Sequence, residues 1–230
     1  MLISPPFGGG RAPVLARNAV ASSQPLATQA GIEALQNGGN AVDAALATAI
    51  TLTVVEPTMN GLGGDGFAIV WDGNKLHGLN ASGRAPAAWT PEYFAGKTAM
   101  DLIGWNTVTV PGMVAGWVAL SKKFGKLPFS QLFKRAISYA ENGFPVSPVI
   151  ARQWREAIPI LKNQPGFSES FLINGKAPQA GQIWKYPAQA KTLQEIAASE
   201  GESFYKGPLA QSMVDFANAT GGCFTMQDFA

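Results

Sequence analysis

The stretch from Gly38 to Phe67 constrains the fold most, because it sets an apolar run between two glycine clusters. The first cluster predicts the end of one helix, since glycine tolerates the left-handed backbone found at helix ends. Asn40 then caps the next helix, and Asp43 favours the positive end of its dipole. Residues 41–55 are almost all small or apolar, which predicts a helix buried on most of its surface. This run is too short for a membrane span of about 20 residues, and Pro57 ends it.

The second cluster, residues 61–66, matches the pattern G-x-G-x-x-G. A dinucleotide site requires a strand before this pattern and a helix after it. Here the order is reversed, because a predicted helix precedes the glycines and a predicted strand follows them. We therefore predict a tight helix-to-strand crossing where only glycine fits. A backbone loop beside a bound substrate is the second interpretation.

Composition predicts a globular chain with a large buried surface. Of the 230 residues, 47% are hydrophobic and 14% are charged, and the net charge is +2. This balance argues against a nucleic-acid binder, which would gather Lys and Arg on one face. A single cysteine, Cys223, excludes an internal disulfide framework. Residues 1–18 predict an irregular lead-in without a secretory pattern, so we expect a cytoplasmic protein, with a removed leader as the alternative.

Local signals place the remaining elements. An Asp-Gly pair between apolar runs predicts a hairpin at residues 72–74, and proline or glycine marks most helix ends. Predicted strands cover Val20–Ala21, Phe67–Trp71, Lys75–Leu79 and Trp105–Val110. Predicted helices begin at a Ser23 cap and cover Ala41–Val55, Met113–Phe124, Pro128 to about Gly143, 147–162, 187–200 and 208–218, the last after a turn at Phe204–Gly207.

The last residues predict the start of another element. Thr225 is followed three positions later by Asp228, a spacing with capping-box character. A helix is therefore expected there, two residues before Ala230. We expect the chain to be the N-terminal piece of a longer polypeptide.

The residues alone give no complete catalytic set. His77 stands in a predicted hairpin strand without partners for a metal site, and Cys223 has no evident activating neighbour. Neither a nucleophile elbow nor a Walker loop is present. Asp43 and Glu56 are explained as acids at helix ends, and Asp65 is the acid expected to face a cavity. The chain is thus predicted to supply binding surface to an active centre located elsewhere.

Several motifs, in order and spacing, resemble the gamma-glutamyltransferase (gamma-glutamyltranspeptidase) family. The resemblance runs from about residue 18 to the end, and it implies that residues 1–230 are the N-terminal part of a large subunit. The implied fold is α/β (α+β), a helix-rich portion of the four-layer αββα sandwich of N-terminal-nucleophile hydrolases. The motifs are Ala27-Thr28-Gln29-Ala30-Gly31, Gly38 to Ala45, Glu56-Pro57, Gly61 to Phe67, Val110-Pro111-Gly112 and Phe204-Tyr205-Lys206-Gly207.

The resemblance also implies a reaction and a partner. Family members cleave themselves into two subunits, and the new N-terminal Thr of the small subunit attacks the substrate with its own amino group as base. No catalytic residue, metal or cofactor is then expected in this chain, which alone is expected to be inactive. The implied partners are the small subunit of the same precursor and a γ-glutamyl amide such as glutathione, with no nucleic acid and no membrane.

One departure from the family concerns substrate binding. The family's carboxylate-binding arginine lies in a pattern like D-F-R-E-M-A-P, whereas residues 80–86 here read N-A-S-G-R-A-P. Ser82 therefore occupies the arginine position, and Arg84 lies two residues later. On an extended segment Arg84 keeps the same face, about 7 Å along, so Arg84, Ser82 and Asp65 are the candidate substrate-binding residues. Arg84 either binds a carboxylate or serves as an ion-pair or carbonyl-capping residue.

Two other functions stay open from the sequence. If Ser82 replaces the arginine, recognition of an amino-acid carboxylate weakens, and the substrate becomes a glutaryl or other acyl amide, as in the related cephalosporin acylases. A chain without a nucleophile is also compatible with a non-catalytic binding or structural module.

Overall fold

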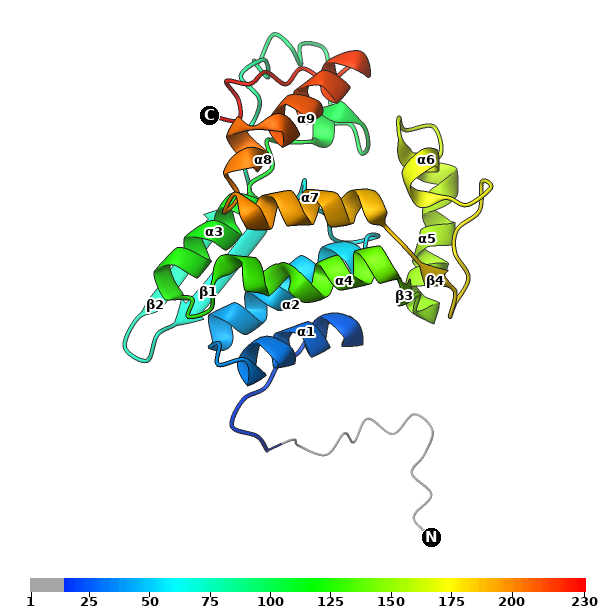
Figure 1. Cartoon of the computed structure of the whole chain (residues 1–230). Helices are drawn as coiled ribbons and strands as arrows, with labels where there is room; N and C mark the ends of the chain where they lie inside the picture. Colours follow the sequence, from blue (N-terminus) through cyan, green and yellow to red (C-terminus); the bar gives the residue numbers. More distant parts are fainter. Residues whose placement is uncertain (1–14) are drawn as a thin grey trace.

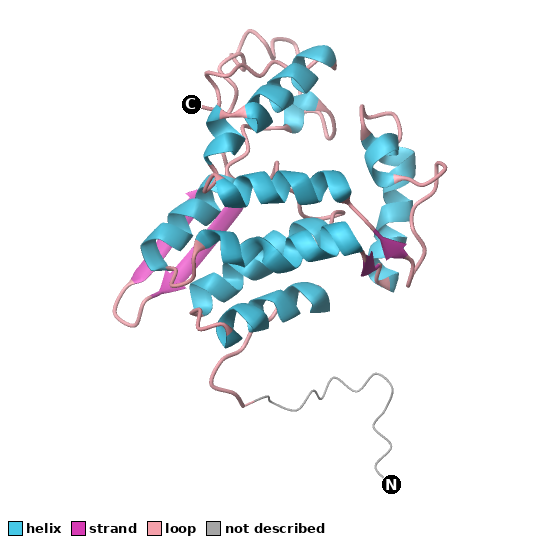
Figure 2. Cartoon of the chain, viewed as in Figure 1, coloured by secondary structure: helices cyan, strands magenta, loops and turns pink. Residues whose placement is uncertain are grey.

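The computed structural model describes residues 15–230, and the first part of the predicted lead-in, residues 1–14, lies outside them. The described chain is mostly helical, with two short antiparallel sheets (Figures 1 and 2). The helices are α1 (Pro25–Gln36), α2 (Ala41–Val55), α3 (Met113–Phe124), α4 (Lys134–Asn142), α5 (Pro148–Leu161), α6 (Phe167–Phe171), α7 (Pro187–Ala198), α8 (Glu202–Lys206) and α9 (Pro208–Ala219). The strands are β1 (Gly66–Trp71), β2 (Leu76–Ala81), β3 (Phe144–Pro145) and β4 (Ile183–Trp184), with 3-10 turns η1 (Trp105–Thr107) and η2 (Phe129–Phe133).

The start of α2 is fixed by a reciprocal cap. The Asn40 side chain accepts hydrogen bonds from the backbone of Val42 and Asp43, and the Asp43 carboxylate accepts one from Asn40 N at 2.9 Å. The same buried carboxylate accepts from Lys126 N at 3.0 Å and from Leu127 N. Asp43 therefore joins the start of α2 to the segment that follows α3. The predicted helix Ala41–Val55 is confirmed at both ends.

A stack of helices forms the main core. Figure 1 shows α1, α2, α4 and α7 in succession across the molecule, with α3 and the hairpin at one end and α5 and α6 at the other. Large side chains from several of these helices are completely buried between them, including Ile50, Phe133, Trp154 and Leu193. Burial of such side chains is worth about 1.5–3 kcal/mol each relative to exposure.

The hairpin β1–β2 packs beside this stack. Its register pairs Gly66 with Ala81 and Trp71 with Leu76. The Asp72 carboxylate closes the turn by accepting from Asn74 N and Lys75 N. One face of the hairpin lies toward α3, and the other carries exposed side chains. Both predicted hairpin strands are confirmed within one or two residues.

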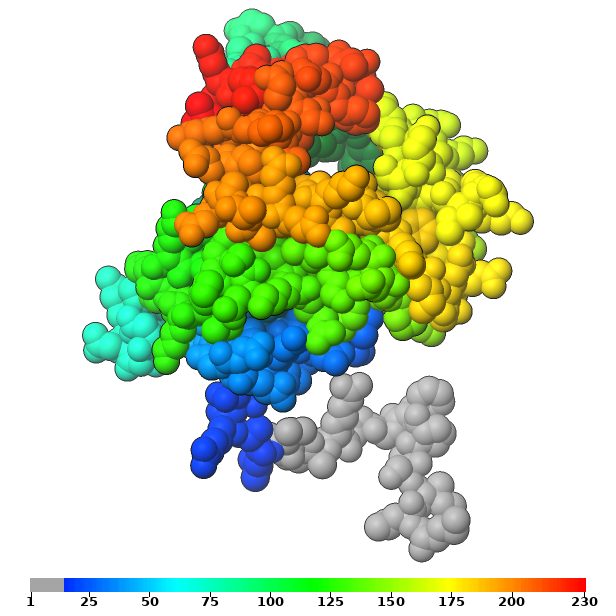
Figure 3. Space-filling model, in the orientation of Figure 1, coloured from blue at the N-terminus to red at the C-terminus, as the bar shows by residue number. Residues whose placement is uncertain are grey.

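A second, smaller core holds the C-terminal part together. Val110, Val214, Ala217, Phe224 and Phe229 are buried in it. In the space-filling view the red C-terminal segment lies against the blue-green segment from the middle of the chain (Figure 3). Residues far apart in sequence therefore meet beside the loop that follows β2.

Five local predictions were wrong. Trp105–Val110 forms the turn η1 and an irregular segment, because the Trp105 indole donates to Thr220 and its ring packs on Phe224. Val20–Ala21 is not a strand. Gln24 caps α1 through its side chain, while the Ser23 hydroxyl donates to Glu56.

The chain after Thr225 forms turns in place of the expected helix, and Phe204–Lys206 belongs to the short helix α8. The other predicted helices agree with the observed ones within a few residues, apart from the start of the fourth, where η2 precedes α4, and α6 was not predicted. Within residues 15–230, no helix has both the length and the apolar character needed to cross a bilayer.

Candidate functional site

Two loops meet at the segment Val110–Gly112, just before α3. Val110 N donates to the carbonyl of Arg84 at 2.9 Å, and Met113 N donates to the carbonyl of Gly64 at 3.1 Å. The glycine-rich loop and the loop after β2 are thus attached to the same short segment. The two sequence regions that hold the candidate residues are brought to one side of the molecule by backbone hydrogen bonds.

The crossing of the loop after β2 with this segment leaves no room for a side chain. Gly83 has φ +75°, and a Cβ there would lie 1.8 Å from the carbonyl oxygen of Val110. A Cβ at Gly112 would lie 2.3 Å from the carbonyl oxygen of Ala81. Glycine is therefore required at both positions, by contact at both and by backbone conformation at Gly83.

The glycine-rich loop of residues 61–66 is less crowded than predicted. A Cβ at Gly61 would meet nothing within 4 Å, and those at Gly63 and Gly66 would meet neighbours only at ordinary contact distances. Gly64 alone is tight, with a Cβ 3.2 Å from the carbonyl oxygen of Gly61. The helix-to-strand order is confirmed, but the expectation that only glycine fits is wrong for most of this loop. The second interpretation, a loop beside a ligand, stays a prediction.

Tyr205 fixes the position of Val110–Gly112. Its hydroxyl donates to the carbonyl of Pro111 at 2.8 Å and accepts from Ala115 N at 2.9 Å. Burial raises the pKa of Tyr205, although the hydrogen bond from Ala115 acts in the opposite direction. The hydroxyl therefore stays protonated and bridges the segment to the first turn of α3. The sequence motifs around Tyr205 and Pro111 gave no sign that the two would touch.

Arg84 reaches the C-terminal segment. Its Nε and Nη2 donate to the carbonyl of Asp228 at 3.3 and 3.1 Å, and Nη2 also donates to the carbonyl of Ala230. These are the contacts of a carbonyl-capping arginine, one of the two predicted roles. The residue is nevertheless exposed, and a guanidinium has five N–H donors. Carboxylate binding therefore stays compatible with this geometry.

Asp228 also joins the C-terminal segment to the loop that contains Arg84. Its buried carboxylate accepts from Ala87 N at 2.8 Å, from Thr225 N at 2.7 Å and from the Thr225 hydroxyl at 2.8 Å. Burial opposes ionisation, but these hydrogen bonds and the charge of Arg84 outweigh it and lower the pKa of Asp228. The carboxylate thus orders both the loop after Arg84 and the C-terminal turn. From the sequence, Asp228 was predicted only to cap a helix that begins at Thr225.

The other two candidate residues take different places. Ser82 is half-buried, and its carbonyl accepts from the Thr109 hydroxyl at 3.3 Å. Asp65 is exposed and lines a cavity of about 280 Å³ between α2, the hairpin and α3. The prediction that Asp65 faces a cavity is confirmed. Neither Ser82 nor Arg84 lines that cavity, so the three residues do not form one pocket within residues 15–230.

The remaining reactive side chains are accounted for by local contacts. His77 Nε2 lies 2.7 Å from Asp72 Oδ2 on the hairpin surface. Hydrogen bonds from Lys75, His77 and Asn74 lower the pKa of Asp72 to about 2. Burial and the Asp228 charge raise the pKa of the Cys223 thiol, against a hydrogen bond with Trp89. Among the described residues no group of three or more His, Cys, Asp or Glu side chains is placed to hold a metal ion.

Comparison with known proteins gives consistent results. The family model described as gamma-glutamyltranspeptidase matches residues 27–230. A glutathione hydrolase-like proenzyme (YwrD) of Bacillus subtilis is 38% identical over 91% of this chain and 41% of its own length. An oxamate amidohydrolase proenzyme of Klebsiella pneumoniae is 39% identical over 88% of this chain and 40% of its own. The chain therefore spans about two fifths of the curated relatives it matches.

A solved structure extends the comparison to the fold. Cephalosporin acylase from Bacillus halodurans is 43% identical, with a TM-score of 0.86 over 100% of this chain and 45% of the acylase chain. This confirms the predicted fold class, the helix-rich α/β portion of an N-terminal-nucleophile hydrolase.

Proposed function

The chain belongs to the gamma-glutamyltranspeptidase family, and from that premise we propose that it is the N-terminal part of the large subunit of a γ-glutamyl amide hydrolase. The observation that supports this most is the extent of the match, which covers residues 27–230 here and about two fifths of the relatives. A chain of that extent is a portion of such an enzyme, and we expect it to be inactive alone.

The proposed division of labour follows from the chemistry. Acyl transfer from an amide needs a nucleophile, a base and donors for the oxyanion. We assign all three to the remaining part of the precursor, where an N-terminal threonine of the small subunit attacks the amide and forms an acyl-enzyme. The acyl group then passes to water or to an amine.

The present chain would contribute binding surface. Arg84 is the proposed donor to the substrate carboxylate, because its exposed guanidinium has five N–H groups and three of them bond the carbonyls of Asp228 and Ala230. Ser82 and Asp65 flank the same converging loops. Asp228 and Tyr205 would act as positioning residues, because they fix the loop and the segment on either side of Arg84.

A second candidate function is an acylase for glutaryl or related acyl amides. It is favoured by Ser82 at the family's arginine position and by the bonds of Arg84 to backbone carbonyls, both of which weaken recognition of an amino-acid carboxylate. The 43% identity to a cephalosporin acylase also favours this second function.

One assay separates the two. The complete precursor would be expressed and tested against γ-glutamyl and glutaryl p-nitroanilides, with a precursor lacking the predicted threonine nucleophile as the control. We expect hydrolysis of the γ-glutamyl anilide with a higher kcat/KM. A preference for the glutaryl anilide would replace the first function with the second. If the precursor cleaves neither substrate and shows no processing, both enzymatic functions would be excluded, and a non-catalytic binding module would be the remaining function.

A further inference from the structure

Asparagine precedes glycine at four positions of the chain, and this pair is open to a backbone reaction that needs no enzyme. In that reaction the glycine nitrogen attacks the side-chain carbonyl carbon of the asparagine, and glycine permits the approach because it has no Cβ. Since the two reacting residues are the same in each case, the surrounding structure decides which pair reacts. The pairs are Asn37–Gly38, Asn60–Gly61, Asn142–Gly143 and Asn174–Gly175.

Helix ends hold two of these pairs. Gly38 N donates to the carbonyl of Leu35 at 3.1 Å, just after α1, and Gly143 N donates to the carbonyl of Tyr139 at 2.9 Å, just after α4. These bonds satisfy the last carbonyls of each helix, so they fix the position of the glycine nitrogen. Reaction at either pair therefore requires the helix end to open first.

The third pair has a free glycine nitrogen but a shielded asparagine. Within residues 15–230, Gly61 N donates no hydrogen bond. Asn60, however, is half-buried, lines the 280 Å³ cavity and donates its own N–H to the carbonyl of Glu56 at 3.1 Å. The end of α2 thus restrains Asn60, and part of its surface is withdrawn from water, which is a reactant.

The fourth pair stands in an open turn. Asn174 and Gly175 are exposed, with φ of +52° and +73°. Positive φ at both central positions defines a type I′ turn, which favours asparagine followed by glycine. Ile173 and Lys176 close the turn by two backbone bonds of 2.9 and 3.0 Å, while Gly175 N donates none within residues 15–230. Figure 1 shows this loop, in yellow, between α6 and β4, at the opposite end of the molecule from the hairpin.

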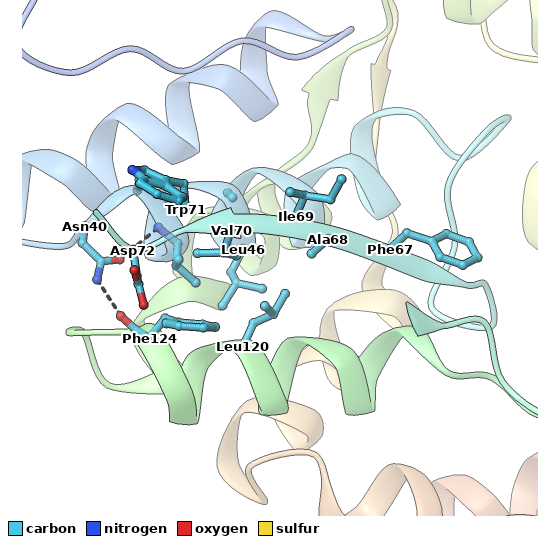
Figure 4. A pocket seen from close by; sticks show the side chains of 13 residues that line it. Asn40, Leu46, Phe67, Ala68, Ile69, Val70, Trp71, Asp72, Leu120 and Phe124 are labelled. Atoms are coloured by element: carbon cyan, nitrogen blue, oxygen red, sulfur yellow. Dashed lines mark hydrogen bonds between the residues drawn. The ribbon is translucent and has the colours of Figure 1, made fainter. Parts of the chain in front are cut away.

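The side-chain amide of Asn174 is also free to turn toward Gly175. Asn40 shows the contrary case, because its amide accepts from the backbone of Val42 and donates to the carbonyl of Phe124 at 2.6 Å (Figure 4). An amide engaged on both sides is held away from the next backbone nitrogen. In the described part of the chain the Asn174 side chain makes no hydrogen bond, and a Cβ at Gly175 would meet nothing within 4 Å.

We propose that Asn174–Gly175 is a site of spontaneous deamidation, at which the backbone isomerises to isoaspartate as the protein ages. Gly175 N gives its proton to solvent and bonds to Cγ of Asn174; the Cγ–Nδ2 bond breaks, and Nδ2 leaves as ammonia. Water then opens the resulting succinimide. Attack at Cγ gives aspartate, and attack at the backbone carbonyl carbon gives isoaspartate, in which the chain runs through Cβ and Cγ. Water is the only co-reactant, and the inference does not depend on the proposed function.

Peptide mass spectrometry of the aged protein tests this proposal. The folded chain is kept in mildly alkaline buffer, which favours loss of the glycine proton, and is digested in acid, which stops the reaction. We expect Asn174 to convert about tenfold or more faster than Asn37 and Asn142, whose glycine nitrogens must first lose a hydrogen bond. Asn60 should lie between. Conversion of any other pair as fast as Asn174 would overturn the proposal.

Unfolding supplies the control for sequence effects. In concentrated urea the helix ends, the cavity and the turn are lost, so we expect the four pairs to react at similar rates. If Asn174 kept its full advantage in urea, its sequence neighbours would cause the difference, and the structural explanation would be wrong.

Two glycine variants test the attacking nitrogen. Gly175 and Gly181 are both exposed, have φ of +73° and +78°, and would meet nothing within 4 Å if they carried a Cβ. Gly175→Ala and Gly181→Ala therefore introduce matched backbone strain, but only the first places a Cβ beside the reacting nitrogen. We expect Gly175→Ala to slow the conversion of Asn174 several-fold and Gly181→Ala to leave it unchanged. Equal rates in the two variants would contradict attack by Gly175 N.

Hydrogen exchange distinguishes the isomer from its charge. Isoaspartate adds one carbon to the backbone of the turn, so the two bonds between Ile173 and Lys176 lose their register. We expect both amides to exchange faster in the aged form. Asn174→Asp adds the charge without the extra carbon and should keep their protection. Equal exchange in the aged form and in Asn174→Asp would refute isomerisation of the backbone.

Discussion

Arg84 has two proposed roles, binding a substrate carboxylate and capping backbone carbonyls of the C-terminal segment. Its guanidinium bonds the carbonyls of Asp228 and Ala230, yet the residue is exposed and retains free donors. A bidentate arginine–carboxylate contact adds both energy and geometric specificity. The two roles therefore predict different consequences when the side chain is removed.

We predict that Arg84→Ala raises KM of the complete enzyme for a γ-glutamyl anilide more than it lowers stability. A charged hydrogen bond of about 1.5–3 kcal/mol corresponds to about a ten- to hundredfold rise in KM. Steady-state kinetics and thermal unfolding measure the two effects. Arg152→Ala is the control, because this arginine is exposed on α5 and pairs only loosely with Glu156. A lower melting temperature with unchanged KM would assign Arg84 to carbonyl capping alone.

Asp228 makes stability depend on pH in a direction that follows from its lowered pKa. Because the folded state binds the proton less tightly than the unfolded state, the carboxylate stabilises the fold at pH values above its ordinary value of 3.8. That contribution is lost as pH falls through the lower pKa of the folded state.

We therefore predict that Asp228→Asn lowers the free energy of unfolding at pH 7 by about 1–3 kcal/mol. The difference from the unchanged chain should shrink as the solution is acidified below pH 4. Urea unfolding between pH 7 and pH 3 measures this. Asp215→Asn is the control, since that exposed carboxylate accepts only from the Gln211 side chain in the described part of the chain. A difference that stays constant with pH would contradict the prediction.

At the scale of elements, the crossing of the loop after β2 with Val110–Gly112 depends on space as well as on conformation. Gly83 and Gly73 both have positive φ, +75° and +97°. A side chain at Gly83 would collide with the Val110 carbonyl, whereas one at Gly73 would meet nothing within 4 Å. The two positions therefore separate crowding from backbone strain.

We predict that Gly83→Ala destabilises the chain by about 3 kcal/mol or more, from strain plus crowding, and that Gly73→Ala costs about 1–2 kcal/mol from strain alone. Chemical unfolding of the two variants measures the difference. Equal losses would mean that the loops separate easily and that the crossing does not hold the Arg84 loop in place.

The elements that sequence predicted well are those with local causes. The helix Ala41–Val55 has its own cap at Asn40 and its own stop at Pro57, and Met113–Phe124 ends at Gly125. The hairpin depends on one Asp-Gly turn. These signals lie within a few residues of the structure that they determine, so no tertiary information was needed.

The elements that sequence missed are determined by distant partners. The alternation from Trp105 onward predicts a strand, but its indole bonds Thr220, which lies 115 residues away. Asp228 suggested a helix start, but its carboxylate also serves Ala87, 141 residues away. The family motif located Arg84 without showing that its first partners would be backbone carbonyls. Contacts of this kind are not encoded in any local pattern.

On the scale of the whole molecule, the two hydrophobic cores meet at a few shared residues. Tyr205 and Met213 are half-buried and pack against both the main core and the smaller C-terminal core. The Tyr205 hydroxyl adds a polar bridge between Pro111 and Ala115, at the point where the candidate loops converge. The C-terminal part is therefore held against the helical stack by packing and by the hydroxyl of the half-buried Tyr205.

We predict that Tyr205→Phe lowers the free energy of unfolding by about 1–2 kcal/mol, because the hydrogen-bonding groups of Pro111 and Ala115 lose their partner. Hydrogen exchange should speed up at the start of α3 and in residues 224–229, while α4 and α7 stay protected, since the main core is untouched. Tyr93→Phe is the matched control, because the Tyr93 hydroxyl bonds Asn106 on the surface. If α4 and α7 lost protection together with residues 224–229, the two cores would unfold as one unit, and the hydroxyl bridge would not be what joins them.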